Sequence, residues 1–468
     1  MPRRYASCLA LVLPLAAGLV ACRLKKEPPA SLAAASTPPP SVADASAAAI
    51  DAATSTPSAS TCPPLDATKT APFTCDDSVV KNPVPPIEDA KATLAPFWDK
   101  LAELGRGTAK TRVRIGVYGD SNLTSDFLTG HLRRVLQERF GDAGHGYVSL
   151  SKPWGSYVHE DVEAGGYWRA FDLYAPTTHV ARDRQYGFAN MAAESNKRGA
   201  AAWAGTAQSK KATVGKLASR FELYFLKQPR GGSFTVMLDG KEVRTVATAA
   251  AEFEAGFEAI ETTDAAHEVR CVVKGDGPVR LCGASLDRDP VTGGIQIDSL
   301  GAGSLNYERL GRVANGTRRA QLARRAYDLV VIWLGANIMW VPPNEALAKA
   351  FIGEVRASLP GVPILILSPA DGVKEDDNRL VIDPRISKLV QQMRDVAIAT
   401  DAAYWDLREA MGGEGSILRL TRRGLTGEDH VHFGREGSAF IGNRLLCAVS
   451  TSLSAHLATN PTAGCVPP

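Results

Sequence analysis

The chain has 468 residues, enough for two domains or for one domain with a large insertion. Hydrophobic residues make up 45% of it and charged residues 22%, as expected for a soluble globular body. The 53 basic and 50 acidic residues leave a net charge of +3 and are spread along the sequence. Because no basic block stands out, the composition argues against a nucleic-acid-binding protein.

The N-terminal residues are typical of an export signal. Arg3 and Arg4 precede an apolar stretch over residues 8–20, which is too short to span a membrane. Leu19-Val20-Ala21-Cys22 resembles the lipobox of bacterial lipoproteins, in which the cysteine is acylated after cleavage; an ordinary cleaved signal is the alternative. We therefore expect residues 1–22 to be a lipoprotein signal peptide. Cys22 would anchor the exported protein in the bacterial cell envelope, in the periplasm or at the outer membrane.

Residues 23–86 are dominated by Ala, Ser, Thr and Pro and predict a disordered stalk. Six cysteines lie beyond Cys22, and in an exported chain they indicate disulfides rather than metal ligands. The sequence does not determine the connectivity. Proximity along the chain favours three local pairs, which are Cys62–Cys75, Cys271–Cys282 and Cys447–Cys465.

A serine lies at the end of the first predicted strand. Alternating apolar residues over 113–117 predict a short buried strand that ends at Gly119-Asp120-Ser121, and helical spacing predicts a helix over 127–140. In open α/β sheets, ligands bind at this end of the strands. Taken alone, the tripeptide favours a simple turn, because all three residues are typical of turns. Three further residues are candidate substrate contacts: Asn122, Trp154 and His159.

The pattern changes over residues 167–290, where short apolar runs follow one another with little helical periodicity. The clearest runs are residues 221–226, 233–238, 269–273 and 279–281. They predict an inserted β-sandwich, similar to a carbohydrate-binding jelly roll.

Helices alternate with strands on both sides of that insertion. A helix over residues 87–104 precedes the first strand. After the insertion, strands are predicted over residues 328–334, 363–368 and 402–406, and helices over 344–359, 384–399 and from 435. This alternation predicts an α/β domain with a parallel sheet covered by helices on both faces. Its two parts are residues 87–166 and 291–468.

A serine nucleophile needs a base, a group that orients the base, and donors for the oxyanion. Asp429 and His432 are one turn apart, so Asp429 could orient His432 to take the Ser121 proton. Asn337 follows a predicted strand, and its amide could donate to an oxyanion. A metal site made of Asp429, His430 and His432 is the alternative, but no fourth ligand lies at a recognisable spacing.

These residues resemble, in order, the four sequence blocks of the SGNH (GDSL-like) hydrolase family. The matching segments are Gly119-Asp120-Ser121, a glycine segment near Gly301, Gly335-Ala336-Asn337 and Asp429-x-x-His432. The resemblance implies a flavodoxin-like three-layer fold and a catalytic triad of Ser121, His432 and Asp429. It also implies oxyanion donors from the Ser121 N–H, the N–H of Gly303 or Ser304, and the Asn337 side chain. No metal or organic cofactor is expected.

The inserted β-domain is similar in position to the one in the peptidoglycan O-acetylesterase branch of that family, where it resembles a carbohydrate-binding module. This resemblance implies a serine esterase that removes small acyl groups, O-acetyl above all, from an acylated polysaccharide or peptidoglycan. Two alternatives remain open. One is a glycan-binding lipoprotein whose hydrolase domain is degenerate, and the other is an acyltransferase that uses the same triad.

Overall fold

The structure is a computed structural model, and it describes residues 62–75, 78–110, 112–154, 157–173, 179–289, 293–337 and 345–465. The predicted signal peptide, Cys22 and residues 23–61 of the predicted stalk lie outside these residues. Within the described ranges, no helix combines the length and the apolar character that crossing a membrane requires.

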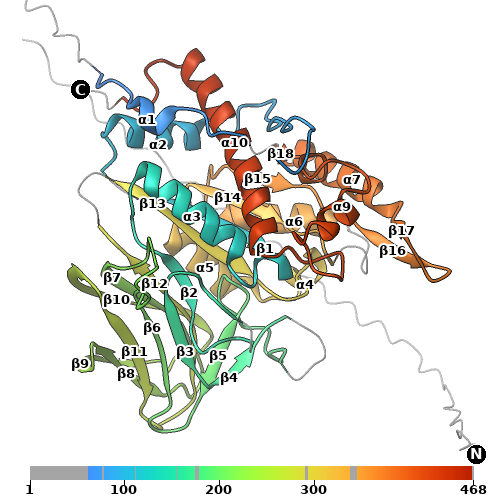
Figure 1. The fold of residues 1–468 in the computed structure, drawn as a ribbon. Coiled ribbons are helices and arrows are strands. Elements are labelled where there is room, and N and C mark those ends of the chain that lie inside the picture. The colour runs from blue at the N-terminus through green and yellow to red at the C-terminus, as the bar shows by residue number, and fades with distance from the viewer. Residues whose placement is uncertain are drawn as a thin grey trace, which may run out of the picture. The chain divides into compact units, whose positions relative to one another are not determined.

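A five-stranded parallel sheet forms the centre of the α/β part (Figure 1). Its strand order is β13-β1-β14-β15-β18, which corresponds to the flavodoxin-like order that the family resemblance implied. The strands are β1 (Arg112–Gly119), β13 (Gly294–Gly301), β14 (Leu329–Trp333), β15 (Ile364–Leu367) and β18 (Ala403–Trp405). Nearly all their residues are buried, because helices cover both faces.

The helices divide between the two faces of this sheet. Val117 belongs to a hydrophobic cluster with α2 (Ala95–Arg106), α3 (Phe127–Phe140) and α10 (Arg435–Thr459). The next residue, Tyr118, faces the other way into a cluster with α5 (Asn315–Arg325), α6 (Glu345–Ser358) and α7 (Arg385–Ala399). The remaining helices are short: α1 (Ala67–Thr70), η1 (Ser121–Leu123), α4 (Tyr307–Leu310), α8 (Leu407–Ala410) and α9 (Ser416–Arg422).

The first helix of the α/β part begins later than predicted. Helical spacing predicted a start at residue 87, whereas α2 begins at Ala95. Glu88 instead exchanges backbone hydrogen bonds with Tyr404 beside β18, and the Asp89 carboxylate accepts the N–H group of Leu94 at 2.9 Å. These contacts hold the preceding residues outside the helix.

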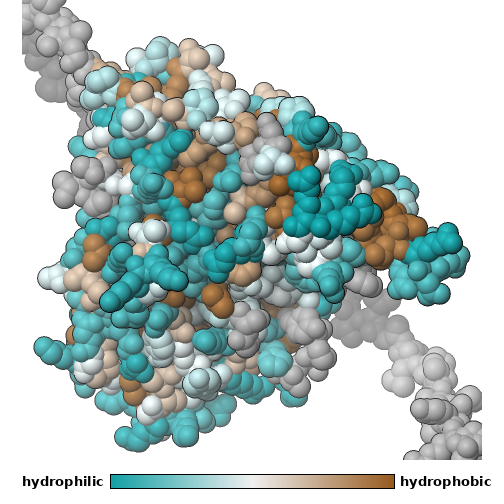
Figure 2. Space-filling view, in the orientation of Figure 1, coloured by the Kyte–Doolittle hydropathy of each residue, from teal (hydrophilic) through white to brown (hydrophobic). Residues whose placement is uncertain are grey.

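A hairpin of two short strands, β16 (Val373–Asp376) and β17 (Arg379–Ile382), is inserted between β15 and α7. This hairpin was not predicted, because strands of four residues give little alternation of apolar and polar residues. Figure 2 shows hydrophobic residues facing solvent at this hairpin, where Leu380 is 50% exposed.

Two antiparallel sheets lie between β1 and β13 in the sequence. The first contains β2 (Gly146–Ser149), β4 (Arg169–Phe171), β5 (Ala192–Ser195), β7 (Ala218–Lys227), β10 (Glu254–Ala265) and β12 (Val279–Asp287). The second contains β3 (Glu163–Gly166), β6 (Ala201–Gly205), β8 (Ser233–Leu238), β9 (Lys241–Ala247) and β11 (Glu268–Val273). Side chains of both sheets, such as Phe225 and Phe234, pack in one hydrophobic cluster. Because β2 and β3 belong to these sheets, the insertion begins before residue 167, where the sequence analysis had placed it.

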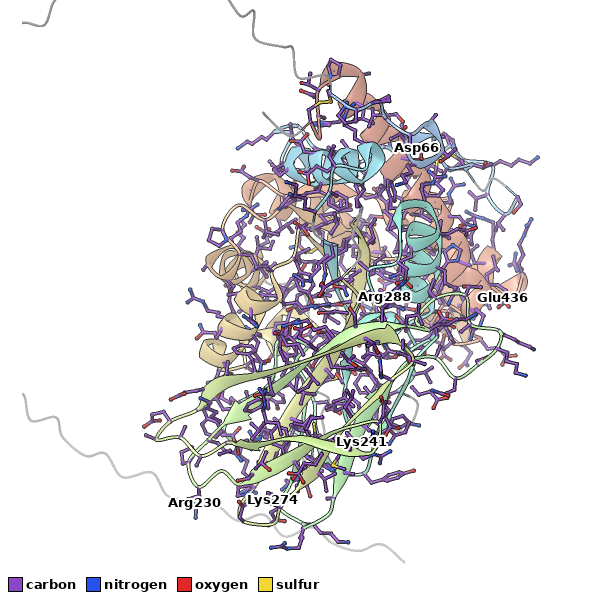
Figure 3. The ribbon with its side chains drawn as sticks, turned by 90° about the vertical axis from the view of Figure 1, so that its left-hand side faces the viewer. Asp66, Arg230, Lys241, Lys274, Arg288 and Glu436 are labelled. Atoms are coloured by element: carbon purple, nitrogen blue, oxygen red, sulfur yellow. A yellow bond between two sulfur atoms is a disulfide. The ribbon has the colours of Figure 1, made fainter. Side chains whose placement is uncertain are left out.

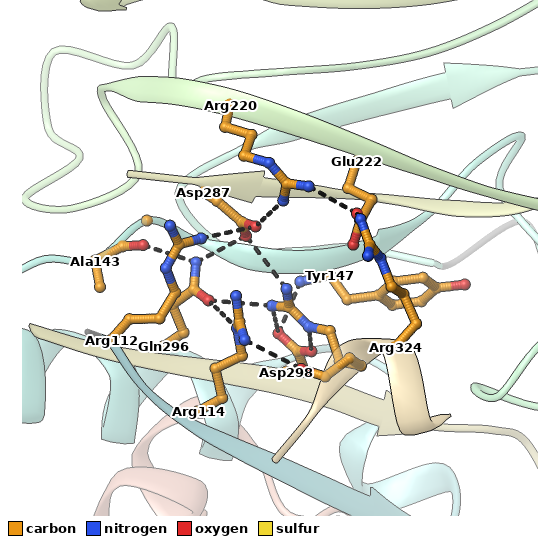
Figure 4. A network of polar contacts seen from close by, with 12 residues as sticks. Arg112, Arg114, Ala143, Tyr147, Arg220, Glu222, Asp287, Gln296, Asp298 and Arg324 are labelled. Carbon is orange, nitrogen blue, oxygen red and sulfur yellow. Dashed lines mark hydrogen bonds and ion pairs between the residues drawn. The ribbon is translucent and has the colours of Figure 1, made fainter. Parts of the chain in front are cut away.

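Buried charges join the parallel sheet to the six-stranded antiparallel sheet (Figure 4). Asp287 on β12 contacts three guanidinium groups, those of Arg112 on β1, Arg220 on β7 and Arg325 at the end of α5. Arg325 also bonds to Asp298 on β13 at 2.6 and 2.9 Å. Because these residues come from both sheets, their contacts fix one sheet against the other.

A second ion cluster lies at the same junction, on the more exposed side. Arg288, labelled in Figure 3, pairs with Asp142, which follows α3, at 3.0 Å. Its guanidinium also contacts Asp264 on β10 at 2.6 Å.

The disulfides correct the predicted pairing and part of the predicted stalk. Cys62 is bonded to Cys465, and Cys75 to Cys447, so the local pairs expected for these four residues are wrong. The segment from residue 62 packs on the α/β part, where α1 contacts α2 and α10 and Val80 is buried. Proximity along the sequence did not predict these disulfides, because both ends of this domain come together at α10.

Cys271 and Cys282 are free and buried, so the third predicted pair is wrong as well. Their spacing predicted that they face each other in one hairpin. Cys271 lies on β11 and Cys282 on β12, and these strands belong to different sheets. The two side chains lie in separate hydrophobic clusters, on opposite faces of the six-stranded sheet.

Candidate active site

Ser121 lies in a tight turn at the carboxyl end of β1. It is the first residue of η1, and the Asp120 side chain caps that short helix by accepting the Asn122 N–H group. The turn brings Leu123 back over the strand, since a Cβ atom on Gly119 would lie 2.3 Å from the Leu123 side chain. Glycine at position 119 is therefore what allows the chain to reverse direction directly before the serine.

The loop before α10 brings a histidine and an aspartate to this turn. Ser121 Oγ donates to His432 Nε2 at 2.8 Å, although 311 residues separate them. His432 Nδ1 donates to Asp429 Oδ2 at 2.7 Å. About half of each of the His432 and Asp429 side chains is exposed, so the group opens to solvent.

The aspartate is held in its charged form. Burial raises the pKa of Asp429, but hydrogen bonds from the His432 ring and from the N–H groups of His432 and Val431 outweigh burial and lower this pKa below its ordinary value. A charged carboxylate at Nδ1 selects the tautomer whose Nε2 accepts a proton. It would also stabilise the imidazolium that forms when Ser121 is deprotonated.

The candidate oxyanion donors lie at the same edge of the sheet. In the sheet register, Gly119 of β1 lies between Gly301 of β13 and Trp333 of β14. The chain continues from these strands to three candidate donor positions: Gly303, Ser304 and Asn337. Asn337 Nδ2 donates to the Leu305 carbonyl oxygen at 3.4 Å. This hydrogen bond joins the Asn337 side chain to the loop after β13.

Asp120 joins the serine turn to the loop after β14. Its fully buried carboxylate accepts N–H groups from Gly335 at 2.9 Å and from Ala336 at 2.8 Å, besides that of Asn122. Burial raises the pKa of Asp120, while these three N–H groups act in the opposite direction. The carboxylate therefore fixes the position of Asn337 relative to Ser121.

Replacing Asp120 with asparagine is expected to lower kcat for a small ester about 10- to 100-fold. The NH₂ group of asparagine would face a backbone N–H group whose hydrogen bond the carboxylate accepts in the wild type. Two donors would then face each other, and a buried donor without a hydrogen bond costs about 1–3 kcal/mol. Steady-state kinetics and thermal unfolding check this expectation together. Unchanged kcat with a lowered Tm would mean that Asp120 supports only the fold.

The structure gives the three predicted substrate contacts different surroundings. Asn122 is 8% exposed, and its Oδ1 accepts the N–H group of Phe433 at 3.0 Å, which links the serine turn to the residue after His432. Trp154 packs edge-on against Tyr157, with ring centroids 5.1 Å apart. The direct substrate contacts of Asn122 and Trp154 stay predictions.

His159, the third of these, lies in a buried polar group beside α3. Its Nδ1 is 3.0 Å from His145 Nε2, and the Asp126 carboxylate is near both rings. Asp126, His145 and His159 are close enough together to surround a cation. Asp126, however, already accepts two hydrogen bonds from Arg133 and one from the Glu160 N–H group, so its oxygens are engaged and a cation would face the guanidinium.

Stability is expected to fall as the pH is lowered from about 7 toward 4. Burial lowers the pKa of His159 to about 4, and burial with the charge of Arg133 lowers that of His145 well below its ordinary value. Between pH 4 and the usual histidine pKa of about 6.5 the unfolded chain binds more protons, which favours unfolding. Thermal unfolding across this range should show a shallower fall for a variant with glutamine at both positions. If the stability of wild type and variant fell equally with pH, His145 and His159 would not be the groups responsible.

His430 takes no part in the serine contact. Its Nδ1 lies 2.9 Å from Thr421 Oγ1, whereas both nitrogens of His432 are occupied by Ser121 and Asp429. The alternative metal set of Asp429, His430 and His432 therefore gains no support from this geometry.

Sequence reasoning missed the roles of Asp120 and Asn122 as links between loops. It treated Asp120 as part of a turn, and the only signal was its place directly before the serine. The partner N–H groups of Gly335 and Ala336 lie more than 200 residues further on, so no local pattern could reveal them.

Residues 274–440 match the GDSL-like Lipase/Acylhydrolase family. This match includes Asn337, Asp429 and His432 and begins after Ser121. The two antiparallel sheets separate Ser121 from the rest of the site in the sequence.

Comparison with solved structures shows the fold. A peptidoglycan O-acetylesterase matches with a TM-score of 0.64 and 21% identity over 79% of this chain and 99% of that chain. A family two carbohydrate esterase from Clostridium thermocellum, in complex with cellohexaose, gives a TM-score of 0.27 and 10% identity over 56% of this chain and 94% of that one. No curated protein matches the sequence. The family match over residues 274–440 and the strand order together make the α/β part of this chain similar to the GDSL-like lipase/acylhydrolase family, and they support an SGNH-type esterase.

Proposed function

We propose that this protein is a serine esterase that removes small acyl groups, O-acetyl above all, from a glycan of the cell envelope. The observation that carries the proposal is the continuous contact from Asp429 through His432 to Ser121, with distances of 2.7 and 2.8 Å. Nucleophile, base and orienting group are then all in hydrogen-bond reach, which is the geometry that acyl transfer requires.

In the first half of the reaction, Ser121 Oγ attacks the ester carbonyl carbon while His432 Nε2 takes the serine proton. Donors from Ser121, from Gly303 or Ser304, and from Asn337 hold the oxyanion of the tetrahedral intermediate. As the intermediate collapses, the proton passes from Nε2 to the departing sugar oxygen. The acyl group remains on Ser121 as an ester.

Water completes the reaction. It attacks the acyl carbon and gives a proton to His432 Nε2, and a second tetrahedral intermediate releases acetate as Ser121 Oγ regains the proton. No metal or organic cofactor enters these steps.

A glycan substrate is supported by the fold as a whole. The similarity to the peptidoglycan O-acetylesterase covers 79% of this chain, more than the α/β part alone contains, and so extends into the antiparallel sheets. We propose that these two sheets form a jelly-roll-like sandwich that binds the carbohydrate, and that the substrate is an acylated polysaccharide or peptidoglycan.

We also propose that the protein is exported and held in the bacterial cell envelope by lipid on Cys22. The sequence around Cys22 supports the anchor. The disulfides Cys62–Cys465 and Cys75–Cys447 support an oxidising compartment, since such bonds rarely persist in the cytosol.

The test is turnover of p-nitrophenyl acetate by the purified protein, combined with a fluorophosphonate probe that labels reactive serines. We expect release of p-nitrophenol and, by peptide mass spectrometry, a single label on Ser121. A folded protein that shows neither turnover nor label would overturn the esterase proposal and favour a glycan-binding protein with an inactive hydrolase domain.

A further inference from the structure

A cavity of about 310 Å³ lies beside β3, one of the two edge strands of the five-stranded antiparallel sheet. Its walls come from β3, from Trp203 on β6 and from the segment of residues 157–162. None of Ser121, Asp429 and His432 lines it. A volume near 300 Å³ is at the lower end of ligand pockets, which suits one ring-sized ligand.

Trp203 is placed on the outer face of this sheet. Its neighbours Ala202 and Ala204 point into the hydrophobic cluster between the two sheets, so the side chain of Trp203 points to the opposite face. Its register partner on β3 is Gly165, where a Cβ atom would lie 2.6 Å from the indole. The missing side chain at position 165 therefore lets the indole lie against the neighbouring strand.

Exposed apolar side chains gather at the same cavity. Tyr167 is fully exposed and Val158 is 47% exposed, and both line it. Only three other large hydrophobic residues in the described part of the chain are exposed. Exposed apolar side chains that gather at one place, unlike single scattered ones, mark interaction sites.

Charged groups accompany the aromatic ones. Lys152 and Glu163 line the cavity, and Ser151 and Lys152 both have positive φ, 66° and 38°. Ser151 is held there because its N–H group donates to the Gly165 carbonyl at 3.2 Å. Two adjacent non-glycine residues therefore hold a costly backbone conformation at this cavity.

We propose that this cavity binds one pyranose ring of a glycan chain. The apolar face of the ring would pack on Trp203 and Tyr167, and its hydroxyl groups would bond to Lys152 and Glu163. A flat ring with one apolar face and a polar rim matches this combination of aromatic and charged walls.

The wall of the cavity is connected to the loop that carries His432. His159 lines the cavity, and the next residue, Glu160, pairs with Arg134 and with Arg435, which lies three residues after His432. A sugar held here would therefore position its chain relative to Ser121. This last step rests on the proposed esterase function, whereas the binding of sugar does not.

The binding test uses the Ser121→Ala protein with chitohexaose and cellohexaose, followed by calorimetry and tryptophan fluorescence. We expect at least one of the two to bind, with affinity reduced about tenfold by Trp203→Ala and also by Tyr167→Ala. Val243→Ala is the matched control, because Val243 is 44% exposed on β9 of the same sheet but outside the cavity. Failure of both oligosaccharides to bind, or binding unaffected by both aromatic substitutions, would overturn the proposal.

A second measurement separates this inference from the esterase proposal. With Ser121 intact, Trp203→Ala and Tyr167→Ala should leave turnover of p-nitrophenyl acetate within about twofold of wild type and lower kcat/KM on O-acetylated peptidoglycan. If p-nitrophenyl acetate is not turned over by any variant while oligosaccharide binding still depends on Trp203, the esterase proposal fails and the sugar site stands. Since Tyr167 is fully exposed, its substitution reports on binding even if Trp203→Ala does not fold.

Discussion

Replacing Ser121 with alanine is expected to lower kcat for p-nitrophenyl acetate by about 10⁴-fold or more, while the protein stays folded. The hydroxyl is the attacking group in the proposed mechanism, and methyl in its place leaves only the oxyanion donors and substrate binding. Replacing His432 with alanine should have a similar effect, because no other base lies within 2.8 Å of the serine among the described residues. Stopped-time assays at saturating ester, with thermal unfolding of each variant, provide the measurement.

Combining these substitutions gives a sharper result than either alone. Groups that act as one unit show strongly non-additive losses, so the double variant Ser121→Ala/His432→Ala should be no slower than the slower single variant. Asp429→Asn should lower kcat by about 10⁴-fold through the wrong imidazole tautomer. If the losses of kcat in the single variants multiplied in the double variant, Ser121 and His432 would act independently, which would contradict a triad.

The adjacent histidine supplies the matched control. His430 bonds to Thr421 and not to the serine, so His430→Ala should keep kcat within a few-fold of wild type. Should His430→Ala abolish turnover while His432→Ala retains it, the assignment of the base would be wrong. Ser121→Ala with activity within tenfold of wild type would equally exclude the serine as nucleophile.

Short-range patterns were enough to predict the elements that surround the site. The strand that ends at Gly119, the helix from Phe127 and the one-turn spacing of Asp429 and His432 all depend on neighbouring residues. The parallel strand order followed from the alternation of strands and helices together with the family resemblance. Local spacing therefore paired Asp429 with His432, and the family resemblance assigned that pair to Ser121.

Contacts between distant segments could not be predicted in this way. The pairing of Cys62 with Cys465 depends on both ends of the domain reaching α10, and Cys271 and Cys282 lie in different sheets despite a spacing typical of a hairpin. The pocket around Trp203 was missed for the same reason, since its walls come from three separate segments. Sequence distance is a poor guide wherever a sheet edge or a domain junction decides the contact.

We expect the largest loss of stability from a substitution at the junction of the parallel sheet and the six-stranded antiparallel sheet. Replacing Arg325 with methionine should destabilise the protein by about 3–5 kcal/mol, because Asp287 and Asp298 would stay buried after losing a guanidinium partner. Methionine keeps much of the side-chain volume, so a cavity contributes little. Urea unfolding of variant and wild type at pH 7 measures the difference.

Arg312→Met is the matched control, since Arg312 pairs with Glu308 on an exposed face where 58% of its side chain is open to solvent. An exposed pair of this kind contributes about 0–1 kcal/mol. Equal losses of unfolding free energy in the two variants would mean that the buried ion pairs stabilise the protein no more than the exposed pair does.

The dependence of that loss on pH separates charge from packing. Burial would raise the pKa of Asp287, but the charges of Arg325 and Arg112 outweigh it and lower this pKa to about 2, against about 3.9 in an unfolded chain. In the wild type this carboxylate therefore stabilises the fold fully above about pH 4, and its contribution is lost as the pH falls toward 2. Without Arg325 the pKa of Asp287 should rise. Protonation would then remove the unpaired buried charge of the variant at a higher pH than in the wild type. The stability gap between variant and wild type is then expected to narrow between pH 5 and 3, whereas a constant gap would assign the loss to packing.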